Sequence, residues 1–312
     1  MGTVHQLIEV YGKTGAAQQA ASEEERRAIE AAAQYMADED SAVACIFSGW
    51  AQAALPHRRL ANDAVWQLQT QHVTLLVEPG RRILPQGEIE FVGVPYGSRA
   101  RLIMLYLQSE ALRTGRREIE LGRSLNAWLL RLGIPRGGKS FNDVREQADR
   151  ISRCHLTFHT RSDGGKAGLL NQNILDGAMF VSQDERQGSL FIETARLSEV
   201  FYEQLTKHPV PIQESAVRAI NNNSMAIDIY CWLAYRLHSL HTTKLLTWPA
   251  LKAQFGAGFQ RADHFKTAFQ NNLALAQAVY PEAKIEVGDE GVTLRPSKPP
   301  VPFRSGGRAI SR

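Results

Sequence analysis

The chain has 312 residues, of which 44% are apolar, so it is long enough to bury the cores of about two domains. Its formal net charge of +4 excludes a polycation, and the distribution of charge therefore matters more than the total. The three cysteines are far apart and lack the spacing of a disulfide framework or a zinc site. No apolar run reaches the roughly 18 residues of a membrane span and no signal peptide is evident, so we expect a cytoplasmic protein without a metal centre.

The first ninety residues predict a short segment of helix and strand. Ser22, followed by three glutamates, is typical of a helix N-cap with acids in the first turn, and the helix runs to about Met36. Apolar and polar residues alternate between residues 71 and 97, and turn signals at residues 79–80 and 85–87 divide them into two strands. Residues 1–90 are therefore predicted to form a helical and β N-terminal segment.

From residue 98 the predicted order is helix, short strand, helix, turn, helix and hairpin. The second helix begins at Ser124, because serine is a favoured N-cap, and Gly133 ends it. The third helix begins near Ser140 and has apolar residues on one face. The same order recurs between residues 225 and 294, which indicates a repeated unit.

The hairpin of the first unit has a strand at residues 155–160, a turn at 162–165 and a returning strand from Gly168. A hairpin that follows a helix-turn-helix is a wing. Arg161 and Lys166 flank the turn, where cations suit contacts with phosphate or with the minor groove.

These elements predict an α+β fold with two tandem winged-helix domains, at residues 91–205 and 206–298, preceded by the short N-terminal segment. Residues 299–312 are predicted to form a flexible basic tail. Residues 295–312 carry five cations, no acid and several prolines and glycines, and such a composition cannot bury enough apolar surface to become ordered.

Positive charge is concentrated in residues 99–153, which hold twelve cations, eleven of them arginine, against six acids. The planar guanidinium of arginine suits phosphate oxygens and guanine edges better than the ammonium of lysine does. The segment therefore indicates a nucleic-acid partner, with a solvated helical surface as the alternative interpretation.

Residues 133–140, GIPRGGKS, allow two interpretations. The octet satisfies the pattern G-x-x-x-x-G-K-[ST] of a phosphate-binding loop. That loop needs a buried strand before it, whereas the preceding SLNAWLLRL has helical periodicity, and no clean acidic strand end supplies a magnesium ligand. As the turn between two helices, the octet would instead present Lys139, Ser140 and the next helix to DNA.

The start of the third helix therefore carries the candidate DNA contacts. A helix in the major groove contacts bases mainly with its first two turns, and asparagine and arginine bind adenine and guanine in a bidentate manner. An exposed side chain without a DNA contact is the alternative for each residue. The candidates of the first unit are Arg136, Lys139, Ser140, Asn142, Arg145, Arg150 and Arg153, with Arg161 and Lys166 at the wing.

Several blocks of the sequence resemble one known family. PYGSRARL and REIELGRSLNAWLLRLG, followed by GIPRGGKSFNDVREQADRI, resemble the central signature of the plasmid-encoded RepA replication initiators of Gram-negative bacteria. SMAIDIYCWLAYRL and FKTAFQNNLALA continue the resemblance, which covers about residues 94–294.

The resemblance implies a non-enzymatic protein without a cofactor that binds repeated sites, called iterons, in the double-stranded DNA of a plasmid origin. It also implies local strand opening, recruitment of the host initiator and the replicative helicase, plasmid copy control, and repression of its own gene by a dimer, hence a monomer–dimer equilibrium. In related initiators the second unit often reads bases while the first holds phosphate or a partner subunit, so the assignment between the units stays open. The matching positions of the second unit are Arg261, His264, Lys266, Gln270 and Asn271.

A transcriptional regulator with the same folds and a nucleotide hydrolase that uses the octet are the alternative functions. A rolling-circle nickase needs two histidines two apart on a strand to hold its metal. His155 and His159 are four apart, and His238 and His241 are three apart. The histidine spacing therefore argues against nicking.

Overall fold

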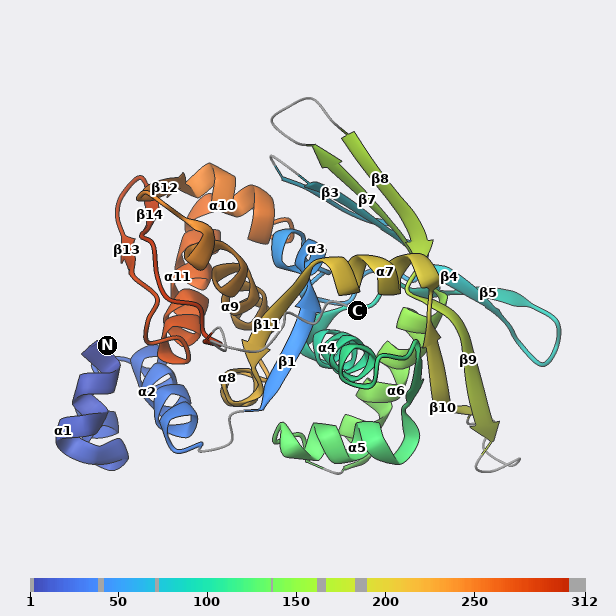
Figure 1. Cartoon of the computed structure of the whole chain (residues 1–312), viewed down its shortest axis with the longest axis horizontal. Helices are drawn as coiled ribbons and strands as arrows, with labels where there is room; N and C mark the ends of the chain where they lie inside the picture. The colour runs from blue at the N-terminus through green and yellow to red at the C-terminus, as the bar shows by residue number, and fades with distance from the viewer. Residues whose placement is uncertain are drawn as a thin grey trace.

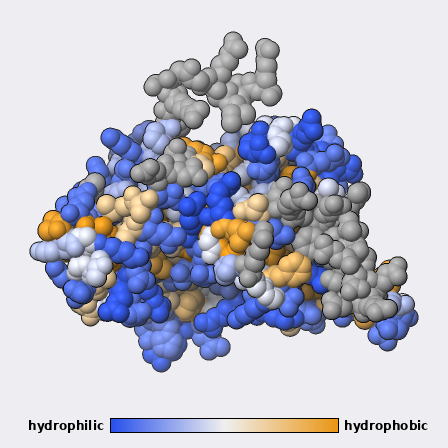
Figure 2. Space-filling model, turned by 90° about the horizontal axis from the view of Figure 1, so that it is seen from below, coloured by the Kyte–Doolittle hydropathy of each residue, from blue (hydrophilic) through white to orange (hydrophobic). Residues whose placement is uncertain are grey.

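The structure is a computed structural model that describes residues 3–38, 42–70, 73–135, 137–161, 167–182 and 190–302. Helices and strands are mixed, and every strand pairing among these residues is antiparallel (Figure 1). The predicted combination of helix and sheet is confirmed. In the same residues no helix is both long enough and apolar enough to span a membrane. The face shown in Figure 2 is mostly hydrophilic, with apolar side chains in small separate patches.

Two units of the chain share the order helix, strand, helix, helix, strand, strand, except that the first unit has a further hairpin at residues 155–173 between its third helix and its last two strands. In each unit the first strand neighbours the last, giving the strand orders β6-β10-β9 and β12-β14-β13. The first unit comprises α4 (Gly97–Thr114), β6 (Glu118–Glu120), α5 (Gly122–Arg131), α6 (Gly138–Arg153), β9 (Leu175–Ser182) and β10 (Leu190–Leu197). The second comprises α9 (Ser224–Arg236), β12 (Lys244–Thr247), α10 (Trp248–Phe255), α11 (Ala262–Ala278), β13 (Ile285–Val287) and β14 (Gly291–Leu294). The predicted recurrence of one element order is present.

The hairpin predicted as the wing of the first unit lies in a different sheet. β7 (His155–Arg161) and β8 (Ala167–Asn173) pair as expected, but the other edge of β7 pairs with β3 (Val73–Glu78), and β2 (Trp66–Gln69) completes the order β2-β3-β7-β8. The hairpin that joins β6 is β9–β10. The predicted position of the wing is therefore wrong, because the local pattern that identifies a hairpin does not specify which strand it pairs with.

The first ninety residues pack against both units. α2 (Glu23–Met36) lies beside α11 and α8 (Glu214–Ala219), and α1 (Thr3–Gln18) packs on α2. Ser22 Oγ accepts a hydrogen bond from Glu25 N at 3.1 Å, which confirms the predicted N-cap. β1 (Val43–Phe47), which leads into α3 (Ser48–Gln52), pairs with β11 (Pro209–Gln213), and the hairpin of β4 (Gly80–Ile83) and β5 (Ile89–Gly93) lies beside α6. α7 (Glu199–Lys207) connects β10 to β11.

A buried ion pair joins the first helices of the two units. Arg101 of α4 and Asp228 of α9 are each 8% exposed. Arg101 Nε and Nη2 donate to the two carboxylate oxygens of Asp228, both at 2.6 Å. The same guanidinium donates to the carbonyl oxygens of Leu55 at 2.7 Å and Gly97 at 2.9 Å. Burial raises the pKa of Asp228, while the charge of Arg101 acts in the opposite direction.

A second set of contacts ties α5 to the segment between the units. The buried carboxylate of Glu214 accepts from Arg131 Nη2 at 2.9 Å and from Trp128 Nε1 at 3.3 Å. Asn221 Nδ2 donates to the carbonyl oxygen of Leu132 at 2.5 Å. The first residue of α8 and a residue just after that helix therefore hold the C-terminal end of α5 in place.

His57 lies at the edge of the Arg101–Asp228 pair. Its Nδ1 is 3.1 Å from Ser224 Oγ and 3.4 Å from Arg101 Nη2. Burial, and to a smaller extent the neighbouring guanidinium of Arg101, lower the pKa of His57 from 6.5 to about 3. The imidazole is therefore neutral in the folded protein at physiological pH.

Replacing Asp228 with asparagine should lower the free energy of unfolding by about 3–5 kcal/mol, because it leaves the charge of Arg101 buried without a counterion. Urea denaturation followed by tryptophan fluorescence measures the change. Glu203→Gln, which breaks the exposed pair of Glu203 with Lys207 on α7, is the matched control and should change stability little. Equal losses in both variants would contradict the role given to the buried pair.

Stability should fall as the pH is lowered from 6.5 towards 3, with His57 contributing to the loss. The unfolded chain protonates this imidazole near its ordinary pKa of 6.5, whereas the folded protein does so only near 3. Between these values the unfolded state binds more protons, so acidification favours unfolding. Urea denaturation at pH 7 and pH 5 should show a smaller pH effect for His57→Gln than for the parent, while the exposed His264→Gln behaves like the parent.

Candidate nucleic-acid interface

The octet at residues 133–140 begins as the end of a helix. Gly133 has φ 77°, in the left-handed region that glycine adopts at helix ends, and Ile134 N donates to the carbonyl oxygen of Leu129 at 2.9 Å. The element before the octet is α5, as the periodicity predicts. A phosphate loop follows a strand, so the octet lacks the geometry of a nucleotide-binding loop.

The first turn of α6 is largely exposed to solvent. Its N-cap is Gly137, in extended conformation, and no side chain caps the helix. Lys139 and Asn142 are exposed, and Ser140 is partly exposed. The first N–H groups of α6 and the ammonium of Lys139 are therefore open to an anion. Arg136 lies outside the described residues.

A groove of about 1010 Å³ runs between α6 and the β4–β5 hairpin. We call it the arginine groove, because six arginines and only two carboxylates line it among the described residues. These are Arg59, Arg81, Arg82, Arg145, Arg150, Arg153, Glu146 and Asp149. Asn142 lies in the same lining, so the predicted face of α6 forms one wall of the groove.

Arg150 is part of the interior and does not face outward. Its side chain is 2% exposed, and Nη2 donates to Glu146 Oε1 at 2.8 Å and to Asn62 Oδ1 at 3.2 Å. Nη1 donates to the carbonyl oxygen of Val94 at 3.0 Å, and the guanidinium lies over the ring of Tyr96. The predicted DNA contact of Arg150 is therefore wrong for this conformation, because the chain around Val94 covers that side of α6.

The other arginines of the groove differ in how strongly the protein holds them. Arg153 donates to Asp149 at 2.7 Å, and Arg82 is paired with Glu90 and lies 3.6 Å from Asp149. Arg59 lies 3.6 Å from Glu146. Within the part of the chain that the structure describes, Arg145 has neither a hydrogen-bond nor an ion-pair partner. Arg145 is therefore the guanidinium that can engage a ligand without breaking a contact.

The sequence pattern did not predict that three further arginines, Arg59, Arg81 and Arg82, line the arginine groove. They belong to the first ninety residues, far from α6 in sequence, and no helical or strand periodicity connects them to it. The adjacent pair Arg81-Arg82 directly after a turn was the one available signal. The groove is produced by tertiary packing.

The candidate residues of the second unit lie near the start of α11. Arg261 and His264 are exposed, and Arg261 is paired with Asp263 at 2.5 Å. Lys266 Nζ lies 5.0 Å from the centre of the Trp248 ring. Gln270 and Asn271 follow on the same helix and are half-buried.

The hairpin turn next to α11 is acidic. Asp289 and Glu290 occupy the turn between β13 and β14 and are exposed. Their carboxylates repel phosphate. The second unit therefore presents a less favourable surface to a polyanion than the arginine groove does.

The predicted wing cations cannot be placed at an interface. Arg161 ends β7 and pairs in register with Ala167, whereas Lys166 lies outside the described residues. His155 of the same strand lies 2.8 Å from Asn173 Oδ1 through its Nδ1. Nowhere in the described ranges do three or more His, Cys, Asp or Glu side chains gather in a way that could hold a metal ion.

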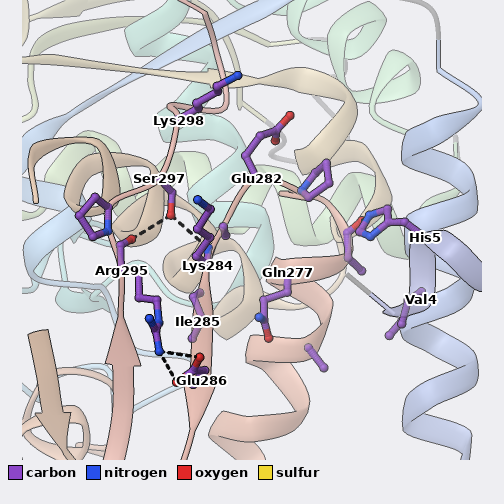
Figure 3. A pocket seen from close by; sticks show the side chains of 16 residues that line it. Val4, His5, Gln277, Glu282, Lys284, Ile285, Glu286, Arg295, Ser297 and Lys298 are labelled. Carbon is purple, nitrogen blue, oxygen red and sulfur yellow. Dashed lines mark hydrogen bonds and ion pairs between the residues drawn. The ribbon is translucent and has the colours of Figure 1, made fainter. Parts of the chain in front are cut away.

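A second hollow, of about 1070 Å³, lies between the start of α1, the end of α11 and the β13–β14 region (Figure 3). Its charges are mixed, since Lys284 and Lys298 are accompanied by Glu282, and Arg295 is paired with Glu286 at 2.9 Å. His5 donates from Nε2 to the carbonyl oxygen of Ala278 at 2.9 Å and anchors α1 there. The hollow lacks the excess of cations that marks the arginine groove.

A family model described as plasmid encoded RepA protein matches residues 94–249, which is half of the chain. A crystal structure of selenomethionine derivatives of domains 2 and 3 of RctB is similar in fold, with a TM-score of 0.50 and 12% identity, over 81% of this chain and 98% of that one. A second crystal structure of RctB domains 2–3 matches with a TM-score of 0.44 and 11% identity, over 75% of this chain and 82% of that one. No curated protein matches.

Two alanine substitutions should distinguish an arginine that stabilises the fold, Arg150, from one that is able to bind a ligand, Arg145. Arg150→Ala should lower the free energy of unfolding by about 2–3 kcal/mol, because it leaves Glu146 and the Val94 carbonyl without their buried donor. Arg145→Ala should change it by less than about 0.5 kcal/mol. Urea denaturation measures both, and a large loss on Arg145→Ala would show that this residue is also structural.

Proposed function

Because the chain belongs to the plasmid-encoded RepA family, we propose that it is a replication initiator that binds repeated sites in the double-stranded DNA of a plasmid origin. The arginine groove is the observation that carries the proposal. α6 and the neighbouring hairpin form the walls of this groove and line it with guanidinium groups, which suit phosphate oxygens and guanine edges. We propose no catalytic step and no cofactor for this activity.

We further propose that both units are winged helices. The support is their common order of elements and their common strand order, in which the first strand neighbours the last. α6 and α11 then occupy the position of the helix that enters the major groove. β9–β10 and β13–β14 occupy the positions of the wings.

In the first unit, α6 approaches the duplex with its first turns. Lys139 and the uncapped N–H groups contact phosphate, while Asn142 and Arg145 reach base edges. Arg145 is the best candidate for reading a guanine, because a bidentate contact with the base costs it no ion pair among the described residues. Arg59 and Arg82 add positive charge on the opposite wall, although each already lies near a carboxylate.

The second unit adds a weaker contact through Arg261, His264 and Lys266. Arg261 must exchange its pair with Asp263 for a phosphate, and the acidic turn of β13–β14 opposes the approach of the backbone. We therefore assign most of the salt-dependent affinity to the first unit. Base contacts by Gln270 and Asn271 would require the half-buried side chains to reorient.

Strand opening, recruitment of the host initiator and helicase, and repression of its own gene by a dimer complete the proposed role, on the support of family membership. Footprinting of the purified protein on its plasmid origin should reveal repeated protected segments. The absence of any preference for origin DNA over random DNA would overturn the proposal. Specific binding without support of origin-dependent plasmid replication in cells would instead favour a transcriptional regulator.

Two substitutions in α6 should have different effects on DNA binding. Lys139→Ala should weaken binding to all sequences alike and lower the slope of log K against log salt by about 0.9, the value for one phosphate contact. Arg145→Ala should weaken binding to the origin site by about 1–3 kcal/mol and relax the preference at one base pair. Fluorescence anisotropy titrations over a range of salt concentrations, with origin and single-substitution duplexes, measure both effects.

Lys207→Ala on α7 is the matched control, because it removes an exposed cation outside the arginine groove. It should leave the affinity and the salt slope close to those of the parent. If Arg145→Ala weakens all duplexes equally, Arg145 contacts phosphate and does not read a base.

A further inference from the structure

The β4–β5 hairpin is a separate ribbon that extends from the body of the protein (Figure 1). β4 and β5 pair with each other and, in the part of the chain that the structure describes, with no other strand. Its turn is well defined, since Leu84 N donates to Glu88 O and Gly87 N to Leu84 O, both at 2.8 Å. The tip of the hairpin therefore has a defined backbone conformation.

The tip of the ribbon exposes an apolar pair. Ile83 and Ile89 lie opposite each other in the register and are 75% and 64% exposed, and Pro85 beside them is also exposed. Ile83 is the most exposed large hydrophobic side chain among the described residues. A single exposed apolar residue is ordinary, but two of them side by side on one projecting tip favour a binding surface there.

The base of the ribbon is fixed against α6. Arg153 Nη1 donates to the carbonyl oxygen of Arg81 at 3.3 Å, and Arg82 lies 3.6 Å from Asp149. A Cβ at Gly80 would collide with the backbone carbonyl of Arg153, so the absence of a side chain allows the close approach. The tip therefore has a defined position relative to the helix that we assign to the major groove.

The tip is also continuous with the arginine groove. Ile83, Leu84 and Pro85 line the groove together with the arginines of α6. A polyanion bound by these arginines necessarily lies beside the ribbon. The charge of the groove indicates a polyanion as the partner of the tip, and under the proposed function that polyanion is duplex DNA.

We infer that the β4–β5 ribbon inserts into the minor groove next to the site of α6 and wedges Ile83 and Ile89 against a base step, unstacking it. Apolar side chains, including isoleucine and proline, act as such wedges in proteins that kink DNA through the minor groove. The inference rests on the proposed DNA binding and assigns the ribbon a separate task within it. Unstacking one step lowers the cost of separating the strands nearby.

The test uses the full-length protein and origin duplexes that carry 2-aminopurine at successive positions within the footprint. Binding of the parent should raise the fluorescence several-fold at one step, because 2-aminopurine brightens when it loses stacking. Ile83→Ser with Ile89→Ser should lose most of this rise and keep the parent's salt slope, since no phosphate contact is removed. Ile83→Phe should retain the rise, because a larger apolar wedge remains.

Val10→Ser is the matched control, because Val10 is 70% exposed on α1 and lies outside the arginine groove. It should behave like the parent. Absence of DNA binding by the parent would overturn the proposed function itself. Binding of the parent without a fluorescence rise at any step, or an unchanged rise in the double variant, would overturn the wedge alone. A double variant that dissociates in sedimentation while its fluorescence rise persists would show that the tip contacts a second copy of the chain, which also overturns the wedge.

Discussion

The arrangement of the two units depends on the buried ion pair of Arg101 and Asp228. Both charges are buried away from water, and the attraction between them offsets the free-energy cost of this desolvation only while both partners remain in place. The bidentate geometry fixes the orientation of α4 relative to α9, and the carbonyl oxygens of Leu55 and Gly97 hold the remaining donors. One side chain thus connects both units and the segment that precedes them, so the proposed DNA-contacting helices are held in a constant relation.

The arginine groove is a composite of distant parts of the chain. α6 supplies one wall and the β4–β5 hairpin supplies the other, while Arg59 comes from the segment before both. Gly93, at φ 86° and in close contact with Arg150, lets the hairpin approach α6 closely. The concentration of arginine in residues 99–153 is therefore only part of the surface, since the packing of the first ninety residues completes it.

Local chemistry explains what could be predicted from the sequence. The N-cap at Ser22, the helix end at Gly133 and the recurrence of one element order follow from residues close in sequence, and the structure contains them. Pairing between strands distant in sequence is not encoded in their local pattern. The hairpin at residues 155–173 is therefore predicted as the wing of the first unit, whereas it pairs with β3 in a separate sheet. Helical periodicity also placed Arg150 on the outer face of α6, where the backbone at Val94 in fact covers it.

The packing of α2 on α11 has a consequence for biosynthesis. α2 leaves the ribosome well before α11, against which it packs. At 5–20 residues per second, the 225 residues between Met36 and Ala262 take roughly 10–45 seconds to make. During that interval α2, which has five buried residues in the finished protein, lacks this partner. α2 therefore completes its packing only after α11 has been made, whereas its contacts with α1 and α8 form between segments that are made earlier.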